Sequence, residues 1–220
     1  MVVASPKIHV VDDDASFRTG MGRLLEACGY RVALYESAAQ LLAKLPSAEL
    51  GCILLDVQMS GLSGPQLQDR LTELGNRLPI IFITGHGDIP TSVQAIKAGA
   101  EDFLTKPVAK AKLLVAVERA LARSAQQQAQ DLEFDALRAR VSRLTPRESE
   151  VFALVVRGKL NKQIAGELGT SERTVKAHRQ KVMEKCGARS LAELVLLAER
   201  LGMVAAAGQD IAPKDNTQRA

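Results

Sequence analysis

The strongest constraint on the fold is an alternation, over the first 121 residues, between short apolar runs and longer amphipathic stretches. The runs are aliphatic or β-branched and end at polar residues or glycine, which is typical of buried strands. They comprise Ile8–Val11, Arg31–Tyr35, Cys52–Leu55, Ile80–Ile83 and, more weakly, Phe103–Leu104. Strands and helices in alternation predict a doubly wound α/β domain, with five parallel strands and helices on both faces of the sheet.

The amphipathic stretches carry apolar residues at helical spacing, which predicts four helices. Their apolar sets are Phe17, Met21, Leu24, Leu25 and Cys28; Leu67, Leu71 and Leu74; Val93 and Ile96; and Leu113, Leu114, Val117 and Leu121. In a fold of this type, ligands bind at the carboxyl ends of the strands. The residues that follow the predicted strands are therefore the candidates for a functional site.

Charged and hydroxyl residues follow four of the five predicted strands. Asp12-Asp13-Asp14 follows the first, Asp56 the third, Thr84 the fourth and Lys106 the fifth. Carboxylates gathered at one edge repel one another, so they favour a hard divalent cation, and Mg²⁺ is bound through few carboxylates together with a phosphate. The hydroxyl and the ammonium suit phosphoryl oxygens, and a carboxylate can accept a phosphoryl group as an aspartyl phosphate. A single Asp at a strand end is commonly a turn or cap residue, so the ordered set carries the prediction.

With these motifs, residues 5–122 resemble the receiver domain of two-component response regulators, a flavodoxin-like fold of five strands and five helices. The resemblance implies that Asp56 is the phosphoacceptor, and that Thr84 and Lys106 contact the phosphoryl group. The implied Mg²⁺ ligands are Asp12, Asp13, Asp56 and the backbone carbonyl of Gln58. The resemblance also implies that Phe103 swings inward on activation, and that the Lys106–Pro107 bond is cis.

This sequence departs from many receiver domains at two positions. Met59-Ser60-Gly61 stands where Met-Pro-Gly is common, and Val108 stands where Phe is frequent. Loss of the proline should leave its loop less stiff. Neither departure removes an implied ligand.

The net charge of +4 is unevenly distributed along the chain. Residues 1–121 carry a net charge of −1, residues 122–140 carry 0 and residues 141–220 carry +5. This difference suggests that the two halves of the chain have separate functions. Residues 123–140 are the expected linker; Leu132, Phe134, Leu137 and Val141 follow a helical spacing there, and Gly and Pro are absent. A semi-rigid helical connector is therefore predicted. Residues 207–220 are expected to form a disordered tail.

Residues 141–206 show the signals of a helix-turn-helix. Thr145-Pro146-Arg147-Glu148 is a capping box with proline at the first helical position, and that helix should end at Gly158. A second helix is predicted over Asn161–Leu168 and a third from Ser171 to about Cys186. Two helices joined by a three-residue turn containing glycine are typical of DNA-binding proteins.

The third helix carries five basic and two acidic residues, a charge suited to phosphates. Residues 144–201 resemble the LuxR-type helix-turn-helix through Asn161-Lys162-Gln163-Ile164-Ala165 and Thr174-Val175-Lys176-Ala177-His178. The resemblance implies a DNA-binding unit from Asn161 to Gln180. The residues expected nearest DNA are Thr174, Lys176, Ala177, His178, Arg179, Gln180 and Lys181. It also implies a final helix over Leu191–Leu201 with a dimer contact through Leu194, Val195 and Ala198.

Composition excludes several classes of protein. The chain has no apolar run long enough for a membrane span and no sign of a secretory signal. Its three cysteines, Cys28, Cys52 and Cys186, are too few and too far apart for a disulfide framework or zinc site. A reducing cytoplasm is expected. His9 and His86 are interpreted as packing and loop residues rather than ligands.

The two halves together resemble a FixJ/NarL-type response regulator. The resemblance implies that a sensor histidine kinase phosphorylates Asp56, and that the chain then dimerises and binds promoter DNA as an activator that contacts RNA polymerase. The chain is not expected to be an enzyme beyond possible self-dephosphorylation. Two alternatives stay open: a phosphatase or phosphotransferase using Asp12-x-Asp14-x-Ser16, and a DNA-binding protein whose receiver is a phosphorylation-independent dimerisation scaffold.

Overall fold

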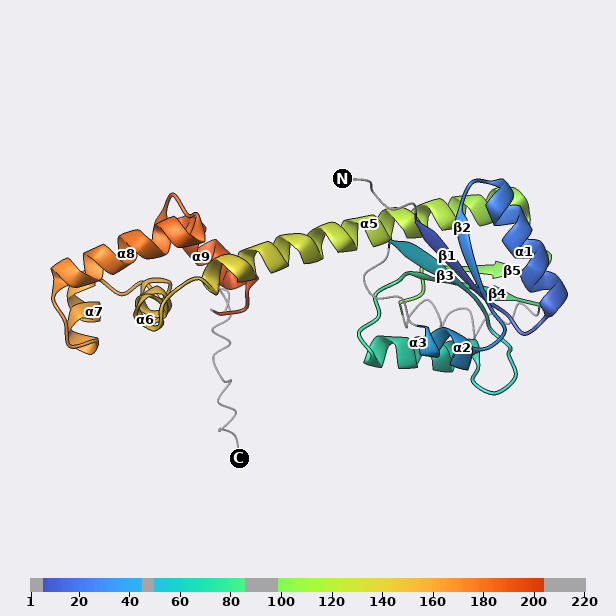
Figure 1. Ribbon diagram of the computed structural model, residues 1–220, viewed down its shortest axis with the longest axis horizontal. Coiled ribbons are helices and arrows are strands. Elements are labelled where there is room, and N and C mark those ends of the chain that lie inside the picture. The colour runs from blue at the N-terminus through green and yellow to red at the C-terminus, as the bar shows by residue number, and fades with distance from the viewer. Residues whose placement is uncertain (1–5, 45–49, 86–98, 204–220) are drawn as a thin grey trace, which may run out of the picture. The chain divides into compact units, whose positions relative to one another are not determined.

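The computed structural model describes residues 6–44, 50–85 and 99–203, and the chain divides into two compact units after Gln130 (Figure 1). Each unit is described by itself. The predicted tail at 207–220, the predicted helix around Val93 and Ile96, and His86 all lie outside the described residues.

The first unit is built on a five-stranded parallel sheet. Its strands are β1 (Lys7–Val11), β2 (Arg31–Tyr35), β3 (Gly51–Asp56), β4 (Ile80–Thr84) and β5 (Asp102–Thr105). The order across the sheet is β2-β1-β3-β4-β5, and every neighbouring pair is parallel. The predicted doubly wound α/β fold is confirmed, because the strand order reverses direction between β1 and β3.

Helices cover both faces of this sheet (Figure 1). On one face, α1 (Ala15–Ala27) and α5 (Lys110–Val141) contribute Leu25, Leu113 and Val117 to a core that includes Ile8 and Leu54. On the other face, α2 (Ala38–Ala43) and α3 (Gly64–Glu73) contribute to a second core. The members of that second core from the two helices are Ala38, Leu41, Leu67 and Leu71. The strands therefore lie between two apolar layers, which explains their continuous apolar runs.

Two details of these helices differ from the sequence expectation. The helix α2 was not predicted, since its six residues are too few to show a helical period. The sequence predicts Leu74 on the same apolar helix face as Leu67 and Leu71, but it caps the C-terminus of α3 and is 52% exposed.

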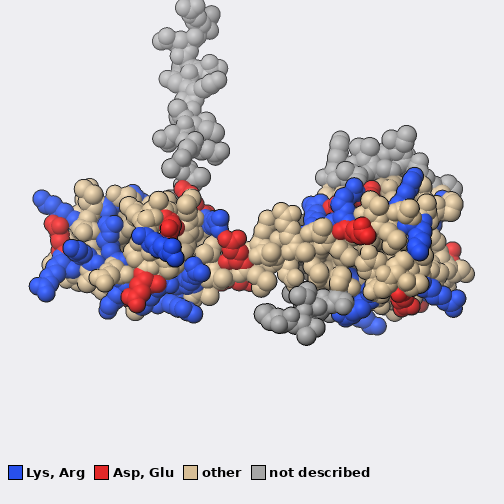
Figure 2. Space-filling view, turned by 90° about the horizontal axis from the view of Figure 1, so that it is seen from above, with Lys and Arg blue, Asp and Glu red and all other residues tan. Residues whose placement is uncertain are grey.

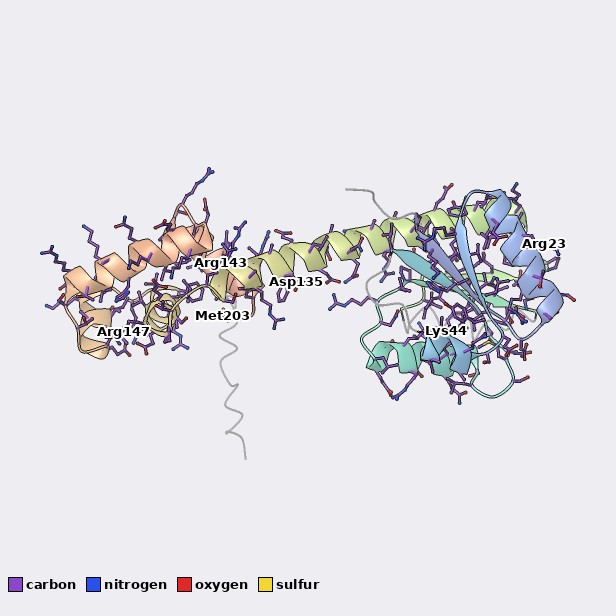
Figure 3. All side chains as sticks on the ribbon, in the orientation of Figure 1. Arg23, Lys44, Asp135, Arg143, Arg147 and Met203 are labelled. Atoms are coloured by element: carbon purple, nitrogen blue, oxygen red, sulfur yellow. The ribbon has the colours of Figure 1, made fainter. Side chains whose placement is uncertain are left out.

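The helix α5 is 32 residues long and continues well past the first sheet. The predicted helical continuation beyond residue 122 is thereby confirmed. Ser124 is buried, and its hydroxyl accepts a hydrogen bond from the Gly51 N–H at 3.2 Å, at the start of β3. Most of the side chains from 125 to 136 are exposed, including Asp135 (Figure 3), whereas Leu137 and Val141 pack against the core of the second unit.

The second unit contains four further helices among its described residues: α6 (Pro146–Val155), α7 (Asn161–Glu167), α8 (Glu172–Cys186) and α9 (Leu191–Arg200). The predicted capping box at Thr145 and Glu148 is present. Ser171 caps α8, and Gly187 ends it in the left-handed conformation (φ 66°) that glycine adopts without strain. The apolar faces of the four helices form one core around Val151, Ile164 and Val175. The α7–turn–α8 pair is the predicted helix-turn-helix.

Candidate functional site

Three carboxylates meet at the carboxyl end of the sheet. Asp12 follows β1, Asp13 is the next residue, and Asp56 ends β3. Each offers a carboxylate oxygen, and these three oxygens lie within 4.8 Å of one another. Asp12 and Asp56 are buried, while Asp13 is exposed. The sequence prediction that strand ends gather these residues is met by the positions of all three.

Lys106 supplies the positive charge at the centre of this group. Its Nζ lies 2.7 Å from Asp12 Oδ2 and 3.2 Å from Asp56 Oδ1. These two carboxylates raise the pKa of Lys106, although burial opposes them. The Lys106–Pro107 peptide bond is cis, as the resemblance implied. The ammonium therefore neutralises part of the negative charge at the strand ends.

Phe17 forms a wall of this site that sequence reasoning missed. Its ring centroid lies 4.1 Å from Lys106 Nζ, a cation–π geometry. Phe17 is on the predicted apolar face of α1, and it also packs against the first core. The sequence signal for its second role is its position in the first turn of the helix that follows the acidic triplet.

Ser60 holds Asp13 in place. Both its backbone N–H and its hydroxyl lie 2.8 Å from Asp13 Oδ2, and these bonds lower the pKa of Asp13. Ser60 stands at the position where many receiver domains have proline. Because proline has no N–H, it could not make the backbone bond. The sequence predicts only a less stiff loop at this position, whereas the structure shows that Ser60 makes two hydrogen bonds to Asp13.

Burial raises the pKa of Asp56, and the neighbouring carboxylates Asp12 and Asp13 raise it further, while Lys106 lowers it. A buried carboxylate beside two others fits a hard cation with oxygen ligands, because such a cation relieves their mutual repulsion. The donor set therefore fits Mg²⁺, with Asp12, Asp13 and Asp56 as the side chains able to hold it.

The remaining receiver residues are placed as follows. Thr84 is buried at the end of β4, and its backbone carbonyl accepts the Lys106 N–H at 2.6 Å. Phe103 is half-buried on β5, with its ring centroid 6.3 Å from that of Phe82. Gln58 is exposed in the loop that follows β3. Thr84 ends β4, as the strand-end argument predicted, whereas Gln58 was implied only by the resemblance to receiver domains.

The second candidate surface is the outward face of α8. Val175 and Val182 are buried in the core of the second unit, which fixes the opposite face of the helix outward. Exposed residues on α8 include Thr174, Lys176, Ala177, Gln180 and Lys181. Figure 2 shows Lys and Arg side chains gathered over the part of the second unit that carries α8.

Two residues expected near DNA, His178 and Arg179, are only partly exposed. Arg179 Nη1 donates to Asn161 Oδ1 on α7 at 2.8 Å. Lys185, one of the basic residues of α8, is paired instead with the buried Glu148 of α6. The positive charge that α8 presents on its outward face is therefore smaller than the number of its basic residues suggests.

The expected dimer contact on the last helix needs correction. Leu194 and Ala198 are buried in the core of the second unit, with 1% and 0% exposure, so they are not available to a second chain. Val195, the third expected contact, is partly exposed and packs against the same core. The apolar residues of α9 lie on one face of the helix, and that face packs into the core of the second unit. Leu191 and Leu196 are the exposed leucines of α9 instead.

The doubly wound domain with its strand-end carboxylates and the basic helix-turn-helix together define the class of DNA-binding response regulators. Residues 8–118 match the response regulator receiver domain family, and residues 142–198 match the bacterial regulatory proteins of the luxR family. The chain belongs to the two-component response regulators with a LuxR-type DNA-binding domain.

Similar proteins support this assignment over most of the chain. This chain is 44% identical over 194 residues to the response regulator protein TmoT of Ectopseudomonas mendocina, and the match covers 88% of each of the two proteins. It is 40% identical over 197 residues to the transcriptional regulatory protein FixJ of Bradyrhizobium diazoefficiens, covering 90% of this chain and 96% of that one. The solved structure of the response regulator StyR is 45% identical, with a TM-score of 0.76, and covers 90% of this chain and 100% of that one.

Among the helices that the structure describes, none combines the length and the apolarity that crossing a membrane requires.

Proposed function

We propose that this chain is a phosphorylation-switched transcription regulator, in which Asp56 is the phosphoacceptor and α8 reads promoter DNA. The observation that carries the proposal is the position of Asp56, buried at a strand end with Lys106 Nζ 3.2 Å away and two further carboxylates beside it. The relatives that share this organisation include proteins named as transcriptional regulatory proteins.

The phosphoryl donor is the phosphohistidine of a sensor kinase. A carboxylate oxygen of Asp56 attacks phosphorus, the P–N bond breaks, and the imidazole leaves with the electron pair and takes up a proton. Lys106 neutralises the charge of the transferred oxygens, and the hydroxyl of Thr84 donates a hydrogen bond to one of them. When bound, Mg²⁺ supplies charge neutralisation for the phosphoryl oxygens. Asp12, Asp13, Asp56 and the carbonyl of Gln58 are its proposed ligands.

Two side chains carry the proposed switch. In the proposal, Thr84 moves toward the phosphoryl group and Phe103 turns inward, which changes the surface around β5 and α5. The altered surface forms a homodimer, and two basic units then bind two half-sites. The bound dimer acts as an activator and contacts RNA polymerase. The proposed parts are a cytoplasmic receiver over 5–122, a linker over 123–140 and a DNA-binding domain over 141–206.

One residue of the motif behind the phosphatase alternative has a structural role. Asp14 caps α1, where its Oδ1 accepts the N–H groups of Ser16 and Phe17 at 2.8 and 3.2 Å. That alternative also has no need of Asp56, which lies with the other strand-end carboxylates beside Lys106. This arrangement favours a phosphoacceptor over a phosphatase.

The experiment compares the parent chain with D56N in the presence of acetyl phosphate and Mg²⁺. Intact-mass spectrometry counts phosphoryl groups, and light scattering measures the oligomeric state. We expect one phosphoryl group and a dimer for the parent and neither for D56N, while D69N, a change at an exposed Asp on α3, behaves like the parent. Dimerisation of D56N to the same extent as the parent would overturn the proposed switch and favour the phosphorylation-independent scaffold.

A further inference from the structure

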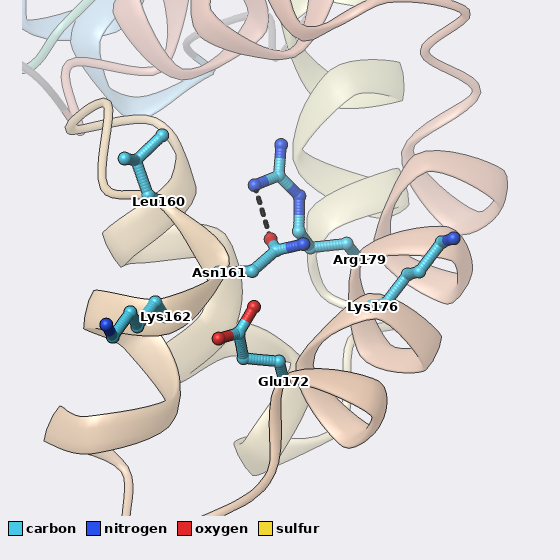
Figure 4. A pocket seen from close by; sticks show the side chains of 6 residues that line it. All are labelled: Leu160, Asn161, Lys162, Glu172, Lys176 and Arg179. Atoms are coloured by element: carbon cyan, nitrogen blue, oxygen red, sulfur yellow. Dashed lines mark hydrogen bonds between the residues drawn. The ribbon is translucent and has the colours of Figure 1, made fainter.

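The helix-turn-helix contains a polar contact that its core does not explain. Arg179 of α8 donates through Nη1 to Asn161 Oδ1 at the start of α7, with the two atoms 2.8 Å apart (Figure 4). The contact joins residues 18 positions apart across the turn. Figure 4 shows the guanidinium bonded through one nitrogen while its other terminal nitrogen points away from Asn161.

The packing of the two helices determines why these side chains meet. Asn161 shares a face of α7 with Ile164 and Ala165, which lie three and four residues on and are buried. Arg179 likewise lies four residues after the buried Val175 and three before the buried Val182. Both polar side chains thus project from the faces that the two helices turn toward each other, at the edge of the core. This position explains why Arg179 is partly buried while its neighbour Gln180 is exposed.

The chemistry of the pair preserves the charge of the arginine. Asn161 is neutral, so it fixes the direction of the guanidinium without cancelling its charge, which a carboxylate would do. A guanidinium has five N–H donors, and among the described residues Asn161 is the acceptor that Arg179 contacts. The remaining donors suit the paired oxygens of a phosphate.

The surroundings of the pair are open and mainly basic. The two residues line a pocket of about 550 Å³ between the start of α7 and the first turns of α8. The same pocket is lined by Lys162 and Lys176, and by a single carboxylate, that of Glu172. The charged side chains around the opening thus include three cations and one anion.

We infer that Asn161 is a positioning residue that holds Arg179 as a preformed clamp for one phosphate of the DNA backbone. This inference rests on the proposed function, since it requires the second unit to bind DNA. It assigns Arg179 a sequence-independent phosphate contact, while Ala177 and Gln180, both exposed on α8, read the bases. An arginine already fixed by Asn161 loses less side-chain freedom when DNA binds than a free one does.

The test is a double-mutant cycle on the full-length chain, with affinity for a fluorescein-labelled duplex of arbitrary sequence measured by anisotropy over a salt titration. We expect R179A to reduce the slope of log K against log salt by about 0.9, because one phosphate contact is lost. N161A should keep the parent slope, since the charge remains, and should weaken binding by about 2- to 10-fold through the lost orientation. The double variant should bind no more weakly than R179A alone.

Two further variants separate positioning from simple structural support. N161D keeps an acceptor for Arg179 but adds a negative charge, so it should reduce the slope as R179A does. K162A removes a charge from the neighbouring residue of the same pocket, which has no hydrogen bond to Arg179 among the described residues, and its effect should add to that of R179A. Thermal unfolding of each variant reports any loss of folded protein.

The outcomes distinguish the inference from the function on which it rests. If the parent binds no duplex with or without acetyl phosphate, both the proposed function and the clamp fail. If the parent binds but the effects of N161A and R179A simply add, or R179A leaves the slope unchanged, the clamp alone is wrong and the Asn161–Arg179 bond is an interhelical tie only. Coupled effects with the expected slopes establish the clamp.

Discussion

At the scale of single residues, the acidic site combines buried negative charge with one internal counter-ion. Asp56 is buried and has a raised pKa, mainly because burial disfavours its charged form. Lys106 opposes this through its ion pairs with Asp12 and Asp56. The charged form of Asp56 therefore reduces the stability of the fold, because burial removes the carboxylate from water.

The first prediction concerns the stability of D56N. A group whose folded pKa lies above its unfolded value reduces stability at neutral pH, where it is charged, and this penalty disappears as pH falls through the folded pKa. Without Mg²⁺, D56N should therefore be more stable than the parent at neutral pH, by about 0.5–2 kcal/mol, the usual range for a stabilising substitution. Urea unfolding at neutral and acidic pH measures the difference, which should shrink as the pH is lowered. A variant less stable than the parent at neutral pH would contradict the prediction.

The second prediction concerns the ring of Phe17 beneath Lys106. F17L preserves most of the apolar packing of this residue in the first core but removes the aromatic face. A double-mutant cycle of F17L with K106M should show a coupling of about 0.5–1 kcal/mol in the free energy of unfolding. The same cycle with K112M, at an exposed lysine of α5, should show none. Equal coupling in the two cycles would mean that the ring does not act on Lys106.

At the scale of helices and strands, α6 and α8 are joined by a charge pair as well as by their apolar faces. Glu148 is nearly buried, and its Oε2 accepts from Lys185 Nζ and from the Thr145 N–H. The bond from Lys185 is the largest cause of a pKa for Glu148 of about 2, against an ordinary value of 4.5. The capping box of α6 thus also anchors the C-terminal end of α8.

The third prediction is the pH dependence of E148Q. A carboxyl group with a lowered folded pKa contributes its full stability above about pH 4.5, and that contribution is lost as the pH falls toward about 2. E148Q should be less stable than the parent at neutral pH, and the gap should narrow over this acidic window in thermal unfolding. E150Q is the matched control, because Glu150 forms an exposed pair with Arg147 on the same helix and should have little effect. A gap that is constant with pH would rule out the charge pair as its cause.

The elements themselves were largely predictable from the sequence, because their signals are local. Aliphatic and β-branched runs identified four strands clearly and the fifth, at Phe103–Leu104, more weakly, and the capping box at Thr145 located α6. The six-residue α2 escaped because it is shorter than two helical turns. The inward packing of Leu194 and Ala198 escaped because an apolar helix face looks the same whether it meets its own core or a second chain.

The candidate site was predictable only in part, for a related reason. Asp12, Asp13, Asp56 and Lys106 follow strands, so the geometry of a parallel sheet brings them together. The contacts of Ser60 with Asp13, Phe17 with Lys106, and Asn161 with Arg179 join side chains from separate elements. Such contacts depend on rotamers and loop paths that no sequence period encodes.

At the scale of the whole molecule, the two units carry different charge and different chemistry. The first 121 residues have a net charge of −1 and the last 80 have +5. Phosphates of DNA should therefore be contacted by the second unit, and the salt dependence of binding should depend on its basic residues alone.

The fourth prediction tests this division of charge in the full-length chain. Replacing both Lys176 and Lys181 with alanine should reduce the slope of log K against log salt by roughly 1.8, about 0.9 for each lost phosphate contact. Both are exposed on α8. The matched control replaces Lys110 and Lys112, two exposed lysines of the first unit, and should leave the slope unchanged. Equal slopes for the two double variants would place the DNA contacts elsewhere.

The position of Lys106 has a consequence for how the site responds to ions. Asp12, whose Oδ2 lies 2.7 Å from the lysine Nζ, is also one of the three carboxylates that suit a metal. A metal ion bound by these carboxylates would therefore compete with Lys106 for the same negative charge. We expect substitutions that loosen the lysine, such as one at Phe17, whose ring lies against Lys106 Nζ, to raise the affinity for Mg²⁺ without removing a ligand.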